Sequence, residues 1–133
     1  MENQDITNEF NGWNKVKINL ELHGRQPNPA QGEIWWASCG KNLGSEINGK
    51  SDKFARPVLV YKKLSRFNFM AVPLTTKNHE GSWYVPFMQN NVREVAVIGQ
   101  AKVMSVKRLY SRIGKIDDSD MRKVREAFIK LYS

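Results

Sequence analysis

The part of the chain that follows Gly32 is divided into short β-type segments, and this division constrains the fold more than any other feature. Segments rich in β-branched and aromatic residues alternate with turn residues, at 33–38, 57–62, 67–75, 82–87, 92–98, 101–106 and 111–116. Beyond Asp118, taken as a helix cap, apolar residues repeat at helical spacing, namely Met121, Val124, Phe128 and Leu131. Several short strands and one terminal helix predict a small, strongly curved β-barrel with a C-terminal helix.

The N-terminal region is predicted to be a helix followed by a linker. An apolar stripe recurs there at helical spacing, formed by Phe10, Trp13, Val16 and Leu20. Thr7 is the expected cap of this helix and Gly24 its expected end. The stretch 25–32 carries two prolines, which prevent both helix formation and sheet pairing. We therefore divide the chain into an N-terminal helix with a Pro-rich linker at 1–31 and a barrel domain at 32–133, and we expect the helix to pack on the barrel.

The charge balance points to a polyanionic partner. The 133 residues carry 21 Lys and Arg against 13 Asp and Glu, a net charge of +8. A small domain this basic is attracted to polyanions such as nucleic acid, although a charge kept for solubility is the alternative. No apolar run reaches the ~20 residues of a membrane helix, and the polar, acidic start is not a secretory signal. The single cysteine, Cys39, fits a reducing compartment, so we expect a cytoplasmic protein without a membrane partner.

Familiar signatures of metal and nucleotide chemistry are absent from the sequence. It contains no H-E-x-x-H, phosphate-loop or paired Cys-x-x-Cys pattern, and its acidic residues do not cluster on the expected strands. We therefore expect neither a metal nor a cofactor. The two histidines, His23 and His79, are of a type that can run acid–base chemistry on RNA, but both lie in segments expected to be exposed, which favours solvated surface residues.

Two strand ends carry the residues best suited to chemistry. Arg56 stands where the long loop 39–55 meets a strand, and Thr75 and Thr76 stand where the next strand ends. Because a hairpin returns the chain to where it began, these two ends are expected to lie close together. Ordinary loop and strand ends also hold such residues, and local sequence leaves both interpretations open.

Five short motifs occur along the chain in a fixed order: Gly32-Glu-Ile-Trp-Trp36, Gly44-Ser-Glu46 with Gly49, Arg56-Pro-Val-Leu-Val60, Pro73-Leu-Thr-Thr76, and Gln100 with Lys107-Arg-Leu109. In this order and approximate spacing they resemble the MazF/PemK toxins of bacterial type II toxin–antitoxin systems. The resemblance implies an α+β fold, a small SH3-like (MazF/CcdB-type) barrel, and a homodimer. It also implies metal-independent, sequence-specific cleavage of single-stranded RNA, the activity of an mRNA interferase, and a cognate acidic antitoxin.

The chain departs from the family's pattern in ways that bear on the site. Its N-terminal helix lies outside the shared motifs, as in an extended PemK-like subgroup, and six residues separate Gly49 from Arg56. One branch of the family has a histidine near the glycine loop and an acid beside the position of Gln100. Ser45 and Gly99 stand at those positions here. The match is to the other branch, which pairs an arginine with a threonine.

The resemblance therefore predicts Arg56 and Thr75 as catalytic residues. The guanidinium of Arg56 can hold two phosphate oxygens in the transition state, while Thr75 hydrogen-bonds the 2′-hydroxyl or a phosphate oxygen. Glu46 is the candidate general base, and a salt bridge that fixes its loop is the alternative role. RNA contacts are expected from loop, strand-end and turn residues: Gly44, Ser45, Lys50, Lys53, Phe54, Thr76, Lys77 and Gln100.

Adjacent tryptophans on the first strand are expected to face opposite ways. Of Trp35 and Trp36, one is a core residue, and the other stacks on RNA or packs at a dimer interface.

Two other functions compete with the ribonuclease interpretation. One is a gyrase-poison toxin of the same fold, whose expected aromatic-Gly-Ile tail is replaced here by Lys130-Leu-Tyr-Ser133. The other is a non-catalytic RNA-binding barrel.

Overall fold

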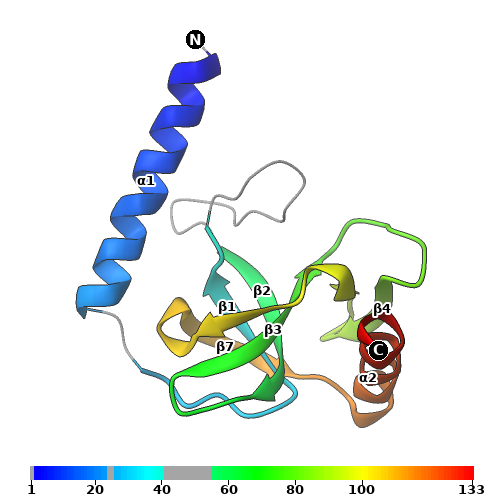
Figure 1. Ribbon diagram of the computed structural model, residues 1–133. Coiled ribbons are helices and arrows are strands. Elements are labelled where there is room, and N and C mark those ends of the chain that lie inside the picture. Colours follow the sequence, from blue (N-terminus) through cyan, green and yellow to red (C-terminus); the bar gives the residue numbers. More distant parts are fainter. Residues whose placement is uncertain (1, 24–25, 41–54) are drawn as a thin grey trace.

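The computed structural model describes residues 2–23, 26–40 and 55–133 and has two helices at the ends of a curled sheet (Figure 1). The elements are α1 (Glu2–His23), β1 (Glu33–Ser38), β2 (Ala55–Lys63), β3 (Asn68–Thr75), β4 (Tyr84–Gln89), β5 (Val92–Val97), the 3-10 turn η1 (Ile98–Gln100), β6 (Lys102–Ser105), the 3-10 turn η2 (Val106–Arg108), β7 (Leu109–Lys115) and α2 (Asp118–Tyr132). The predicted α+β fold, with a small barrel and a helix at each end, is confirmed.

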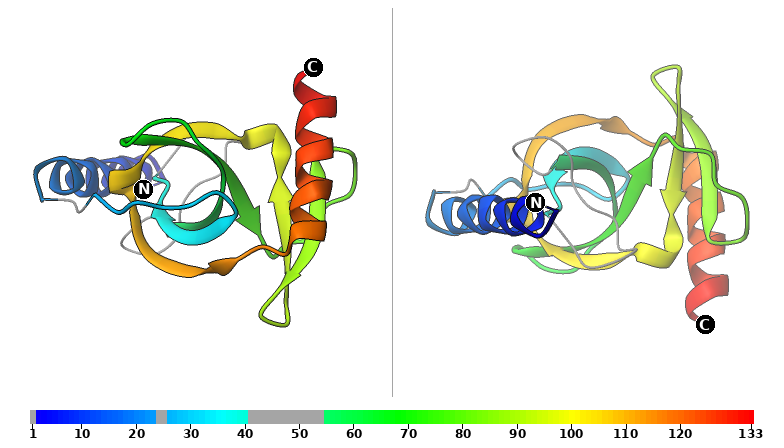
Figure 2. Two further views of the ribbon diagram at one scale, coloured as in Figure 1. Left: turned by 90° about the horizontal axis from the view of Figure 1, so that it is seen from below. Right: turned by 90° about the horizontal axis from the view of Figure 1, so that it is seen from above.

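The strands form one antiparallel sheet that curls on itself. Within the described residues its order is β4-β5-β3-β2-β1-β7, and β6 pairs with the first half of β3. The end of β3 pairs instead with β5, at Leu74 and Thr75, so β3 connects the two parts of the curl. Register shifts interrupt the β1–β7 and β2–β3 pairings. Such irregularities bend strands, and Figure 2 shows the resulting curl seen from two sides.

Both faces of β2 are buried, and each face contributes to a different core cluster. Leu59 packs with residues of α2 and β4, including Val124 and Phe87, between the sheet and the C-terminal helix. Val58 and Val60 pack on the opposite side, inside the curl. A run of apolar residues in place of strict alternation is what a strand buried on both faces requires.

The C-terminal helix covers one side of the sheet through the stripe expected from the sequence. Met121 and Val124 are buried, and Phe128 and Leu131 pack partly buried against the same cluster. The Phe128 ring stacks on Tyr61 of β2 with centroids 4.2 Å apart. The expected cap is displaced by one residue: Asp118 is the first residue of α2, and the cap position is Asp117, whose side chain makes no capping hydrogen bond.

The N-terminal helix packs on the barrel, as expected, but of the four residues in its apolar stripe only Trp13 is buried, and its first turns extend away from the sheet (Figure 1). The Trp13 ring lies against Gly40, and the Arg108 guanidinium lies 5.3 Å from the ring centroid. The expected cap at Thr7 is wrong. The helix begins at Glu2, so Thr7 lies in its second turn, where the hydroxyl donates to the Asn3 carbonyl over 2.8 Å. The expected end at Gly24 lies outside the described residues.

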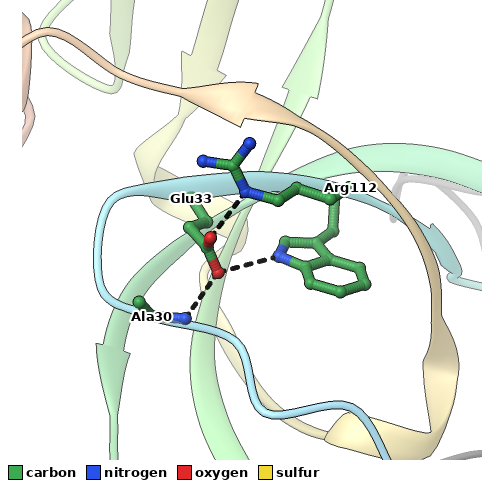
Figure 3. Close-up of polar contacts among 4 residues, drawn as sticks. Ala30, Glu33 and Arg112 are labelled. Carbon is green, nitrogen blue, oxygen red and sulfur yellow. Dashed lines mark hydrogen bonds and ion pairs between the residues drawn. The ribbon is translucent and has the colours of Figure 1, made fainter.

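Glu33 joins the linker to the barrel (Figure 3). Its Oε1 accepts from the Ala30 amide over 2.6 Å and from the Trp35 indole over 3.2 Å, and its Oε2 accepts from Arg112 Nε over 2.6 Å. Burial raises the pKa of Glu33, but these hydrogen bonds and the charge of Arg112 outweigh it and hold the pKa below its ordinary value. The predicted boundary near Gly32 is thus a fixed junction, where the Gly32 amide donates to the Val60 carbonyl over 2.8 Å.

Candidate active site

Arg56 and Thr75 lie at neighbouring strand ends, as the hairpin argument predicts. The β2–β3 pairing starts at Val58 and Pro73, two residues inward from Arg56 and Thr75 along their strands. Arg56 Nη1 donates to the Leu74 carbonyl over 3.2 Å, so the guanidinium reaches across to β3 at the residue that precedes Thr75.

Arg56 is partly buried. Burial lowers the pKa of Arg56 from its ordinary value, and the nearby Cys39 opposes this shift. Burial likewise raises the pKa of the Cys39 thiol, which Lys102, Arg56 and Arg108 oppose. An arginine keeps its charge in proteins, so Arg56 is a partly buried cation in the pocket wall. Such a group is suited to binding the charge that develops on a phosphate.

The two threonines differ in exposure. Thr75 is buried, with 8% of its surface exposed, and its Oγ1 accepts from the Lys77 amide over 3.3 Å. Thr76 is exposed. The strand β3 ends at Thr75, so Thr75 is covered by the sheet whereas Thr76, one residue past the strand, reaches solvent.

A pocket of about 490 Å³ is lined by these residues and others, from six strands in all. Its lining comprises Trp36 of β1, Ala55, Arg56 and Pro57 of β2, Leu74 and Thr75 of β3 with Thr76, Gln89 of β4, Asn90, Val92 and Glu94 of β5, and Tyr110 and Ile113 of β7. Trp36 is the outward-facing tryptophan, with 39% of its surface exposed. Trp35 is partly buried and packs against the core cluster that contains Val58 and Val60. The prediction that the pair faces opposite ways is confirmed.

Sequence reasoning missed Glu94. Its Oε2 is buried and has no hydrogen-bond partner within the described part of the chain, and burial raises the pKa of its carboxyl group. A carboxylate that lines a pocket without a partner is a functional candidate. The available signal was an acid in the apolar segment 92–98, but its environment depends on strands far away in the sequence.

The other predicted site residues are dispersed or lie outside the described residues. Lys77 is exposed, Gln100 is partly buried in η1, and neither lines the pocket. His79 is exposed and stacks on Tyr84 at 4.7 Å, as a surface residue does. The predicted loop residues all lie outside the described ranges: Gly44, Ser45, Glu46, Lys50, Lys53 and Phe54.

Among residues 2–23, 26–40 and 55–133, no three His, Cys, Asp or Glu side chains gather in a way that could hold a metal ion. None of the helices in the same ranges combines the length and apolar character needed to cross a membrane.

Comparison with known proteins identifies the family. The model of the PemK-like, MazF-like toxins of type II toxin–antitoxin systems matches residues 30–132. No curated protein sequence is similar enough to match the chain.

Solved structures share the fold at low identity. MazF from Deinococcus radiodurans superposes with a TM-score of 0.64 at 18% identity, over 77% of this chain and 94% of that one. The Mycobacterium tuberculosis toxin MazF-mt6 gives 0.56 at 21% identity, over 75% and 95%. An endoribonuclease from a Mycobacterial species, in complex with its cognate antitoxin, gives 0.59 at 18% identity, over 77% and 93%. With a family model that covers most of its length and a matching fold, this chain belongs to the PemK-like, MazF-like toxins of type II toxin–antitoxin systems.

Proposed function

We propose that this toxin is a sequence-specific endoribonuclease that cleaves single-stranded RNA without a metal ion. One observation carries the proposal: Arg56 and Thr75, the arginine and threonine of the family motifs, line one pocket in a chain of net charge +8. The printed description of one structural relative as an endoribonuclease bound to its antitoxin supports the same activity.

The proposed reaction uses the 2′-hydroxyl of the substrate as nucleophile. Its oxygen attacks the adjacent phosphorus, its proton passes to a general base, and the bond to the 5′-oxygen breaks. The products are a 2′,3′-cyclic phosphate and a 5′-hydroxyl, the latter after protonation of the leaving oxygen. Arg56 stabilises the negative charge on the phosphorus oxygens, and Thr75 hydrogen-bonds the 2′-hydroxyl or one of those oxygens.

The general base of this scheme stays a prediction. Glu46 is the sequence candidate, and a salt bridge within its loop stays the alternative. Arginine is a poor base near neutral pH because its guanidinium stays protonated there, so Arg56 is better suited to protonate the leaving oxygen than to accept the first proton.

The decisive experiment incubates purified protein in EDTA with labelled single-stranded RNA and, separately, with duplex RNA. We expect cleavage of the single strand, products with cyclic phosphate ends, and an intact duplex. Cleavage that requires added magnesium, or RNA left intact at micromolar protein, would contradict the proposal. A gyrase supercoiling assay on the same preparation tests the gyrase-poison alternative, and RNA binding without cleavage would instead favour the non-catalytic barrel.

We propose two protein partners as well, a second copy of the chain and an acidic antitoxin. Exposed aromatic surface outside the pocket, such as Trp83, favours burial in a homodimer, the commonest closed assembly. We propose that the toxin acts in the cytoplasm. There a carboxylate-rich segment of the antitoxin should compete with RNA for the positive charge of the toxin. Mass measurement at micromolar concentration tests the dimer, and competition between antitoxin and an RNA analogue tests the shared site.

A further inference from the structure

The pocket beside Arg56 contains a second group of residues that phosphate chemistry does not require. This group, called here the Glu94 side of the pocket, consists of Trp36, Pro57, Val92, Glu94, Tyr110 and Ile113. We propose that the Glu94 side binds one unpaired guanine base of the RNA, with Trp36 and Tyr110 as stacking surfaces and the Glu94 carboxylate as the hydrogen-bond acceptor. The inference rests on the proposed ribonuclease function and names the base that the site selects.

One oxygen of the Glu94 carboxyl group lacks a hydrogen-bond donor within the described part of the chain. That oxygen is Oε2, and it is buried. Leaving such an oxygen without a donor is costly, because water no longer solvates it and no protein group replaces the water. A ligand that enters the pocket with N–H groups supplies the missing donors. The pocket thus favours a donor-bearing ligand at this position over an apolar one.

Burial raises the pKa of Glu94. Arg56 and Glu94 line the same pocket, so one RNA strand can place a phosphate against Arg56 and a base against the Glu94 side.

The remaining walls suit a flat ring. Trp36 and Tyr110 have 39% and 40% of their surfaces exposed and come from β1 and β7, which pair with each other. Pro57, Val92 and Ile113 add apolar surface. Unpaired bases bind proteins by stacking on aromatic side chains while their edges are read by hydrogen bonds. Aromatic walls around one buried acceptor match this mode of recognition.

Guanine fits an acceptor-only group better than the other bases do. Its N1–H and N2–H donors lie side by side, so a carboxylate can accept from both. Adenine and cytosine present one amino donor beside an acceptor nitrogen, which repels a carboxylate oxygen. An amide carries one donor and one acceptor and matches adenine or cytosine instead. Exchanging Glu94 for glutamine should therefore change the selected base.

The first test measures base preference during cleavage. Wild type, Glu94→Gln and the surface control Glu126→Gln, which removes the same charge from an exposed position on α2, each cleave a randomised single-stranded RNA pool in EDTA. Product ends are then sequenced. We expect guanine at one fixed position for wild type and the control, and about a tenfold shift from guanine towards adenine or cytosine for Glu94→Gln. Cleavage with no guanine preference, or with the same preference in Glu94→Gln, would overturn the inference.

The second test measures binding without cleavage. Oligothymidylates lack the 2′-hydroxyl, so versions carrying one central guanine, hypoxanthine or adenine cannot be cleaved by the proposed reaction. We expect wild type to bind guanine about tenfold tighter than hypoxanthine, which lacks the N2 amino group, and Glu94→Gln to lose this difference. Guanine-selective binding by a protein that cleaves no RNA would support the guanine site and contradict the proposed ribonuclease function. Active cleavage with equal binding of all three would do the reverse.

Discussion

Arg56 donates a 3.2 Å hydrogen bond to the carbonyl of Leu74, the residue before Thr75. This bond ties the guanidinium to the end of β3, next to Thr75, and both residues line the pocket. We expect Arg56→Ala to reduce RNA cleavage at least 10²–10³-fold while the protein stays folded. Arg122→Ala, which removes a charge from an exposed position on α2, is the matched control and should retain activity. Cleavage rates and melting curves check both, and a fully active Arg56→Ala would remove Arg56 from the mechanism.

The two threonines should differ in their effect on rate. Thr75 is buried beside Arg56 and Thr76 is exposed. Thr75→Ala should lose about one hydroxyl hydrogen bond in the transition state, ~1–2 kcal/mol or roughly tenfold in cleavage rate. Thr76→Ala should lose less. Single-turnover cleavage measures both, and the reverse order would mean that the exposed hydroxyl is the one that contacts the RNA.

Gly40 should tolerate no side chain because Trp13 occupies the space. A Cβ at Gly40 would overlap the indole ring, coming within 2.6 Å of Nε1, and Gly40 also has φ +92°. Gly40→Ala should therefore destabilise the fold in two ways: by ~1–2 kcal/mol through backbone strain, and by a further ~1–3 kcal/mol through overpacking against Trp13. Gly81→Ala is the control, since Gly81 has φ +120° with nothing within 4 Å of its Cβ position. Chemical unfolding compares the two, and equal losses would show that α1 adjusts freely.

The contribution of Glu33 to stability should depend on pH. Folding lowers the pKa of Glu33 from its ordinary value of 4.5, so its carboxylate stabilises the fold above pH 4.5 and loses this effect as the pH falls through the lower folded value. At pH 7, Glu33→Gln should cost about 1–2 kcal/mol, near the low end because Arg112 is half exposed. The difference should shrink as the pH falls below 4.5 and be lost once the pH is below the folded value. Melting curves at pH 7 and over a descending acid series, with Glu126→Gln as control, provide the measurement. A difference that persists in acid would assign the effect to packing.

Removing α1 should weaken the fold and spare the chemistry. We propose that 1–31 and 32–133 are separable, since none of the pocket residues lies before Trp36. A chain that starts at Asn28 loses the contacts of Trp13 with Gly40 and Arg108, so it should melt earlier yet cleave RNA in EDTA. A truncated protein that stays folded but is inactive would place α1 in the active site.

The local sequence was sufficient to predict the helices and strands, because each is specified by the spacing of apolar residues within its own segment. The apolar stripe of α2 and the β-type segments specify which face each element buries, and the structure confirms them. The caps were less predictable. Thr7 and Asp118 have side chains suited to a helix cap. However, α1 begins at Glu2, before Thr7, and Asp118 is already the first helical residue of α2, with Asp117 at the cap position. Helix ends depend on which neighbouring residues reach helical geometry first, and several polar residues compete for that position.

The sequence by itself determined that Arg56 and Thr75 would lie near each other, because one hairpin connects their strands. Only the tertiary structure decided what surrounds them. Glu94, Trp36 and Tyr110 come from β5, β1 and β7, and they share a pocket because the sheet curls and β3 pairs with different strands at its two ends. Burial of Glu94 is a property of that curl, since a carboxylate loses its water only when distant strands cover it.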